Sequence, residues 1–160
     1  MIIVLMGVCG SGKTTIGELL AKRLHCGFSD ADSFHPAENV EKMRAGIPLQ
    51  DEDRWPWLRA IRAAIEDWQR RGQWHILACS ALKQAYRDIL SPDGDVMFVN
   101  LKGTPELIRA RLKGRTGHYM NPALLDSQLE TLEEPVNALT VDIDDTPEGI
   151  VKTIMAHLPE

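Results

Sequence analysis

The feature that most constrains this chain is a glycine-rich segment directly after an apolar run near its amino-terminal end. Residues 2–6 are all apolar, and residues 7–14 then read Gly-Val-Cys-Gly-Ser-Gly-Lys-Thr. This spacing matches the pattern GxxxxGK[ST], in which backbone N–H groups surround phosphate oxygens at the positive end of a helix dipole. Leu19, Leu20 and Leu24 give the following segment the apolar face of a helix. The strand, loop and helix together predict a phosphate-binding loop.

The residue types in this loop indicate a nucleoside triphosphate as its ligand. We expect the Lys13 ammonium to reach the β- and γ-phosphates and the Thr14 hydroxyl to be a metal ligand, so ATP and Mg²⁺ are the expected cofactors. A glycine-rich turn in a fold that binds no nucleotide would not explain why Lys and Thr follow the last glycine. The residues expected to hold the nucleotide are Gly7, Gly10, Ser11, Gly12, Lys13, Thr14 and Thr15.

Apolar runs alternate along the chain with segments of helical periodicity. Because the runs are rich in Val, Ile and Leu without strict alternation, they are typical of a parallel sheet buried on both faces. The pattern predicts an α/β chain with the three-layer P-loop NTPase fold, in which a five-stranded parallel sheet has helices on both faces. The expected strands are residues 2–6, 27–30, 74–79, 96–101 and 138–143.

Local signals also mark several helix ends. Thr104 and Thr146 each precede a proline, which combines an N-cap residue with proline at the first helical position. Gly72 is expected to end a longer helix. The apolar stripe of that helix is Leu58, Ile61, Ile65 and Trp68.

The length of 160 residues predicts a single domain spanning residues 1–160. Residues 32–72 contain two helical segments, which is more than one crossover needs, and we expect them to form a helical substrate-binding insertion. Residues 114–121 form a glycine-containing basic loop between two helices, and a mobile lid is expected over about residues 111–125.

Charge and cysteine content exclude several other classes. The chain has a net charge of −5, whereas proteins that bind nucleic acids usually carry an excess of basic residues. No nucleic-acid partner is therefore expected. Cys9, Cys26 and Cys79 are widely spaced, which favours neither a zinc site nor a disulfide framework. The apolar run at the start is too short to span a membrane, so no membrane partner is expected and a cytoplasmic location is predicted.

The positions of the carboxylates help to distinguish among the classes of nucleotide-binding protein, such as GTPases, ATPases and kinases. The segment Asn100-Leu101-Lys102-Gly103 lacks the carboxylate of a guanine-reading NKxD motif, and the apolar run before Cys79 ends without an acid. Asp30 and Asp32 follow the second predicted strand instead, and residues i and i+2 of an extended segment point to the same side.

Asp30 and Asp32 are candidates for two different roles in phosphoryl transfer. We predict that Asp30 supports Mg²⁺ and that Asp32 orients an acceptor hydroxyl and takes its proton, although the reverse assignment stays open. The alternative is that both carboxylates merely cap the following turn.

A cluster of basic residues between Lys102 and His118 supplies positive charge. Transfer of a phosphoryl group requires charge neutralisation at the transferring group. Arg111 and Arg115 are four residues apart near one helical face, so we predict that both act as catalytic lid residues. The alternative is a solvated helix face.

Beyond the phosphate loop, several strings resemble the gluconate kinases (gluconokinases), small P-loop kinases related to shikimate and nucleoside monophosphate kinases. They include Asp-Ala-Asp-Ser-Phe-His-Pro at residues 30–36 and Arg-Thr-Gly-His-Tyr at residues 115–119. The others are residues 39–43, 48–54, 56–58, 79–83, 86–88 and 127–133, so the resemblance covers nearly the whole chain.

This resemblance implies transfer of the ATP γ-phosphate to the terminal hydroxyl of D-gluconate, a role in carbohydrate metabolism and a homodimer. Because gluconate is a polyol with a carboxylate, Arg54 is the natural bidentate partner of that carboxylate. The residues implied to bind the substrate are Asp32, His35, Lys42, Arg54, Lys83, Arg87, His118 and Gln128. Adenine is expected near residues 144–147.

The chain departs from the family pattern at two positions. Cys9 stands where the family usually has Ser, and Tyr119 stands where it usually has Phe. Cys and Ser are both small and the phosphate cradle is made by backbone, while Tyr adds a hydroxyl without removing the ring, so activity is expected to survive. The alternatives are a shikimate or nucleoside monophosphate kinase, or a nucleotide-dependent switch that binds a partner protein.

Overall fold

The centre of the molecule is a parallel sheet of five strands, in the order β2–β3–β1–β4–β5. This is a computed structural model in which residues 1–113 and 122–159 are described. Each predicted strand is confirmed to within one residue at either end. The strands are β1 (Ile2–Met6), β2 (Gly27–Asp30), β3 (His75–Ala78), β4 (Val96–Lys102) and β5 (Leu139–Asp142).

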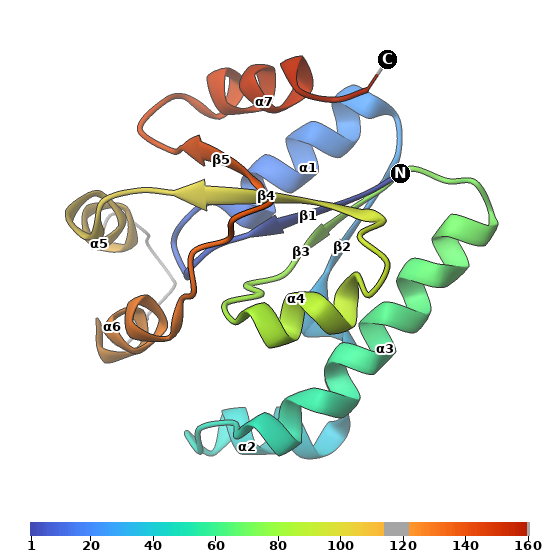
Figure 1. Ribbon diagram of the computed structural model, residues 1–160. Coiled ribbons are helices and arrows are strands. Elements are labelled where there is room, and N and C mark those ends of the chain that lie inside the picture. The colour runs from blue at the N-terminus through green and yellow to red at the C-terminus, as the bar shows by residue number, and fades with distance from the viewer. Residues whose placement is uncertain (114–121, 160) are drawn as a thin grey trace.

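Helices cover both faces of this sheet, as Figure 1 shows. α1 (Lys13–Leu24) and α7 (Pro147–Ala156) pack together on one face, whereas α3 (Asp51–Arg70) and α4 (Gln84–Leu90) pack together on the other. The predicted three-layer α/β architecture is therefore confirmed. The remaining helical elements are the 3-10 helix η1 (Ala31–Phe34), α2 (Ala37–Arg44), α5 (Pro105–Lys113) and α6 (Pro122–Thr131).

The central strand β1 is buried along its whole length and joins two hydrophobic cores. Ile3 and Leu5 belong to the core beneath α1 and α7, whereas Ile2, Val4 and Met6 belong to the core beneath α3 and α4. A strand whose two faces are both packed in this way holds the start of the following loop in a fixed position. The phosphate-binding loop begins at the residue that follows it.

The predicted helix signals are confirmed in the structure. The Thr104 hydroxyl accepts a hydrogen bond from the amide of Leu107 at 3.2 Å, and the Thr146 hydroxyl accepts one from Gly149 at 3.0 Å. Gly72 has a φ of +67° and lies just past the end of α3. None of the helices within the described ranges is long and apolar enough to cross a membrane.

Candidate active site

Three glycines of the phosphate loop adopt backbone conformations that favour glycine. Gly7, Gly10 and Gly12 have φ values of +148°, +81° and +93°. A Cβ atom on Gly7 would lie 2.8 Å from the Ser11 hydroxyl and 2.9 Å from the Leu101 carbonyl oxygen, so a side chain is excluded there. These glycines therefore set the tight path that lets backbone N–H groups converge.

The Ser11 hydroxyl is a buried polar atom that has no hydrogen-bond partner in the part of the chain that the structure describes. Leaving such a group unsatisfied costs about 1–3 kcal/mol in a protein interior. A polar ligand held by the loop would satisfy the hydroxyl. Together with the glycine conformations, this shows that the residues fit a bound phosphate group.

The Lys13 side chain folds back over the loop that precedes it. Its ammonium donates hydrogen bonds to the carbonyl oxygens of Gly7 at 2.9 Å and Val8 at 3.0 Å. Burial lowers the pKa of Lys13, and neighbouring thiols and the carboxylates of Asp32 and Asp30 oppose that shift. The structure therefore brings both predicted carboxylates within electrostatic reach of the phosphate loop.

Asp30, the last residue of β2, and Asp32, in η1, differ in their surroundings. One Asp30 carboxylate oxygen accepts a hydrogen bond from the Asp32 amide at 2.9 Å, so the capping role is confirmed for Asp30. The Asp32 side chain is 84% exposed, so an acceptor hydroxyl can approach its carboxylate from solvent. The pKa of Asp32 is raised, first by partial desolvation from the neighbouring protein and then by the negative charge of the Asp30 carboxylate. The catalytic and metal-supporting roles of these residues stay predictions.

Arg54 and Lys83, both predicted to bind the substrate, meet at one carboxylate. The Lys83 ammonium lies 3.4 Å from the carboxylate of Asp51, and an Arg54 nitrogen lies 3.5 Å from it. The Tyr86 hydroxyl donates to the same carboxylate at 2.6 Å, and this hydrogen bond is the main reason why the pKa of Asp51 is lowered. Two cations and one carboxylate leave the cluster with a net positive charge, which suits an anionic acceptor.

Lys42 and His35, the other predicted substrate-binding residues of the insertion, already have protein partners. The Lys42 ammonium lies 2.7 Å from the Asp53 carboxylate. The His35 ring stacks on Trp57 with ring centres 4.3 Å apart. These contacts fix α2 against the first turns of α3, so both side chains have defined positions before any acceptor binds.

Arg87 and Gln128 have structural contacts that differ from the predicted roles. The Arg87 side chain is buried, and its guanidinium donates to the carbonyl oxygens of Ala81, Leu82 and Glu133 and to the Gln84 side chain. The side-chain amide oxygen of Gln128 accepts a 2.6 Å hydrogen bond from the backbone N–H of Cys9. The Arg87 guanidinium is thus engaged in holding the segment after β3, and Gln128 ties α6 to the phosphate loop.

We expect Arg87→Met to destabilise the fold by about 3 kcal/mol, because three backbone carbonyl groups lose their buried donor. Urea unfolding followed by circular dichroism measures this loss. Arg59→Met removes an exposed arginine from α3 and is the matched control, with an expected change below about 0.5 kcal/mol. An Arg87 variant as stable as this control would contradict the structural role.

A hollow of about 280 Å³ opens between the phosphate loop and the start of α7. Gly10, Ser11 and Thr15 line one side, and Asp145 and Pro147 line the other, which is where the adenine was predicted. Arg111 also lines this hollow, and its guanidinium donates to the Ile143 carbonyl. The other predicted lid residues, Arg115 and His118, lie outside the described residues.

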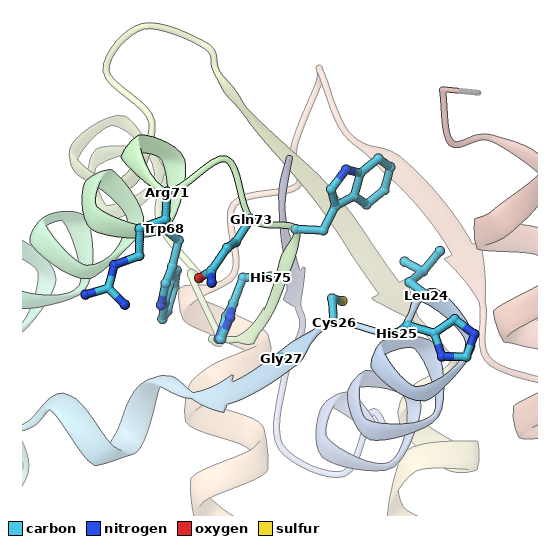
Figure 2. Close-up of a pocket in the computed structure, with 9 residues that line it drawn as sticks. Leu24, His25, Cys26, Gly27, Trp68, Arg71, Gln73 and His75 are labelled. Carbon is cyan, nitrogen blue, oxygen red and sulfur yellow. The ribbon is translucent and has the colours of Figure 1, made fainter.

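A larger hollow of about 740 Å³ lies at the opposite end of the strands, around the starts of β2 and β3. Figure 2 shows Trp68 and His75 stacked on one side of it, with Leu24 and His25 on the other. Ligands of open parallel sheets bind outside the carboxyl ends of the strands, where the phosphate loop lies. The smaller hollow is therefore the candidate nucleotide site.

Asp51, Tyr86 and Asn39 contact predicted site residues although no sequence pattern had predicted them there. A signal for Tyr86 was its position three residues after Lys83, which places both side chains near one face of a helical turn. Asn39 is a polar residue that is only 3% exposed, and nothing in its local sequence indicates that burial.

Comparison with known proteins identifies the family to which this arrangement belongs. The chain is 45% identical over 155 residues to the thermoresistant gluconokinase of Escherichia coli (strain K12), covering 94% of this chain and 89% of that protein. It is 44% identical over 172 residues to a probable gluconokinase of Dictyostelium discoideum, covering 99% of this chain and 86% of that protein. The chain belongs to the gluconokinase family. The predicted kinase class is thereby confirmed.

Solved structures agree with membership of the gluconokinase family. A gluconokinase from Sinorhizobium meliloti 1021 matches with a TM-score of 0.84 and 43% identity, covering 96% of this chain and 89% of that one. The shikimate kinase family model matches residues 9–159. The shikimate kinase of Aquifex aeolicus vf5 has a TM-score of 0.60 at 19% identity, covers 98% of this chain and 94% of that one, and shares the fold.

Proposed function

We propose that this chain transfers the γ-phosphate of ATP to the terminal hydroxyl of D-gluconate, giving 6-phospho-D-gluconate and ADP. The observation that carries the proposal is the pairing of a complete phosphate loop with an open carboxylate, Asp32, and a cationic cluster at Arg54 and Lys83. Two relatives that are 44% and 45% identical to the chain bear names with the same acceptor, gluconate.

The residues of the chain have separate tasks in this reaction. Asp32 accepts the proton of the acceptor hydroxyl while that oxygen forms a bond to the γ-phosphorus and the bond to the ADP oxygen breaks. Lys13 and Arg111 offset the negative charge on the phosphates, and Arg115 is assigned the same task. Mg²⁺, held through Thr14 with support from Asp30, would neutralise phosphate charge when bound.

The cationic cluster explains why an aldonate is favoured over a neutral sugar. Arg54 and Lys83 can bind the substrate carboxylate, and the Asp51 carboxylate that joins them can accept hydrogen bonds from substrate hydroxyl groups. His35, Lys42 and Gln128 stay candidates for further contacts to the acceptor, as does His118. The homodimer, the cytoplasmic location and the lack of a nucleic-acid partner stay predictions.

Release of ADP, measured with a panel of acceptors, tests the proposal. We expect kcat/KM with gluconate to exceed that with shikimate, nucleoside monophosphates and other aldonates by about 10³-fold or more, because a polar site discriminates strongly against groups that leave it unpaired. D-Glucitol is the matched control, since it has the terminal hydroxyl of gluconate without the carboxylate. Shikimate is the main alternative acceptor in the panel, because the shikimate kinase family model matches most of the chain.

Equal turnover of gluconate and D-glucitol would contradict the role of the cationic cluster. Faster turnover of shikimate than of gluconate would show that shikimate, and not gluconate, is the acceptor. Tight binding of ATP with no turnover on any acceptor would instead support the nucleotide-dependent switch.

A further inference from the structure

The His35 side chain is buried against α3, close to Asp32. It is only 4% exposed, and its ring is nearly parallel to that of Trp57, at an angle of 11°. The Trp57 indole N–H donates to the Ala31 carbonyl oxygen at 2.7 Å, which fixes this ring against η1. The imidazole plane is therefore set by packing and not by contact with solvent.

The neighbouring Asn39 decides where the imidazole carries its proton. The Asn39 amide nitrogen lies 2.8 Å from the Asp53 carbonyl oxygen and 3.2 Å from the Nδ1 atom of His35. Because a backbone carbonyl oxygen can only accept, the NH₂ group of Asn39 must face it, and the second N–H then points to His35. Nδ1 is therefore an acceptor, and the proton of the neutral ring is on Nε2.

The protonated Nε2 atom of His35 faces the carboxylate of Asp32. The distance from Nε2 to the nearer Asp32 oxygen is 3.9 Å, just beyond hydrogen-bond length. The exposed Asp32 side chain has room to rotate and close this gap, whereas the His35 ring is held by its stacking on Trp57 and its contact with Asn39. Burial lowers the pKa of His35 against the opposing effect of the Asp32 carboxylate, and the Arg54 charge adds to the lowering, which favours the neutral ring.

We propose that Asn39 and His35 form a positioning chain, in which Asn39 holds the His35 proton on Nε2 and His35 then orients the Asp32 carboxylate toward the acceptor hydroxyl. The proposal rests on the proposed function, because it takes Asp32 as the group that accepts the proton. It changes the role of His35 from a contact with substrate to a donor that acts through Asp32. One fixed N–H is enough for this task, since the carboxylate has a second oxygen free for the acceptor.

The tautomer of His35 can be measured without any turnover. In ¹⁵N nuclear magnetic resonance spectra of the whole protein at neutral pH, His35→Gln identifies the His35 ring signals by their loss. We expect an unprotonated Nδ1 and a protonated Nε2. A proton on Nδ1 would overturn the proposal.

Two substitutions at His35 separate orientation of Asp32 from packing. His35→Phe keeps a ring for stacking on Trp57 but has no N–H, whereas His35→Gln loses the ring but places an N–H near the position of Nε2. A hydrogen bond to a charged group corresponds to about a ten- to hundredfold change in rate. We therefore expect His35→Phe to lower kcat by about ten- to a hundredfold with the KM for gluconate within about threefold, and His35→Gln to retain more of kcat.

The opposite order, with His35→Phe more active than His35→Gln, would show that only packing matters and would overturn the proposal. Full activity of His35→Phe would do the same while leaving the proposed function intact. If the unaltered protein turned over no gluconate, the proposed function would fail, and the tautomer measurement would still decide whether Asn39 sets the proton of His35.

Discussion

Asp32→Asn is expected to lower kcat with gluconate by about 10²–10⁴-fold, which is the usual contribution of a positioned general base. The amide keeps the size of the side chain but cannot take the proton of the acceptor hydroxyl. Because Asp32 lies in η1, just after β2, and not in the phosphate loop, we expect the dissociation constant for magnesium-ATP to stay within about threefold of the original. Single-turnover kinetics and calorimetric titration measure the two quantities separately.

Asp93→Asn is the matched control for this substitution, because Asp93 is exposed in the turn before β4. It should leave both quantities unchanged. Retention of turnover by the Asp32 variant would remove Asp32 from the role of base. The assignment would then pass to Asp30, which is the other carboxylate in reach of Lys13.

Lys13→Met is expected to separate activity from stability. Loss of the ammonium removes a charge that stabilises the transferring phosphoryl group, so kcat/KM for ATP should fall by about 10²–10³-fold. The free energy of unfolding should stay the same or rise, because burial of the ammonium is unfavourable and already lowers the pKa of Lys13. Coupled assays and urea unfolding measure the two effects.

Lys22→Met is the control for this second substitution, since Lys22 is an exposed residue on the same helix, α1. We expect it to change neither activity nor stability appreciably. A Lys13 variant that unfolds easily would show that the ammonium mainly supports the loop through its hydrogen bonds to Gly7 and Val8. Its loss of activity would then be a secondary effect.

The features that were predicted correctly from the sequence are determined by residues close to one another in the chain. The bounds of the strands, the N-caps at Thr104 and Thr146 and the turn at Gly72 follow from side chains within a few residues of each feature. The phosphate loop belongs to the same class, because one continuous segment contains all the residues that make it.

The contacts that sequence analysis missed join residues far apart in the chain. Tyr86 and Asp51 are 35 residues apart, and Gln128 and Cys9 are 119 residues apart. Their meeting depends on how α3, α4 and α6 pack on the sheet, which no local pattern reveals. Arg87 illustrates the same limit, because an arginine in a short helix gives no sign that its guanidinium turns inward to hold backbone carbonyl groups.

The central claim is that the phosphate loop holds ATP so that its terminal phosphate passes to the far hydroxyl of gluconate. The most direct test is ³¹P nuclear magnetic resonance of a mixture of the protein, ATP, Mg²⁺ and gluconate. The account predicts loss of the γ-phosphate signal and a new phosphomonoester signal, split by the two protons of a terminal CH₂ group. Release of inorganic phosphate alone, or a phosphate ester on a CH carbon, would contradict it.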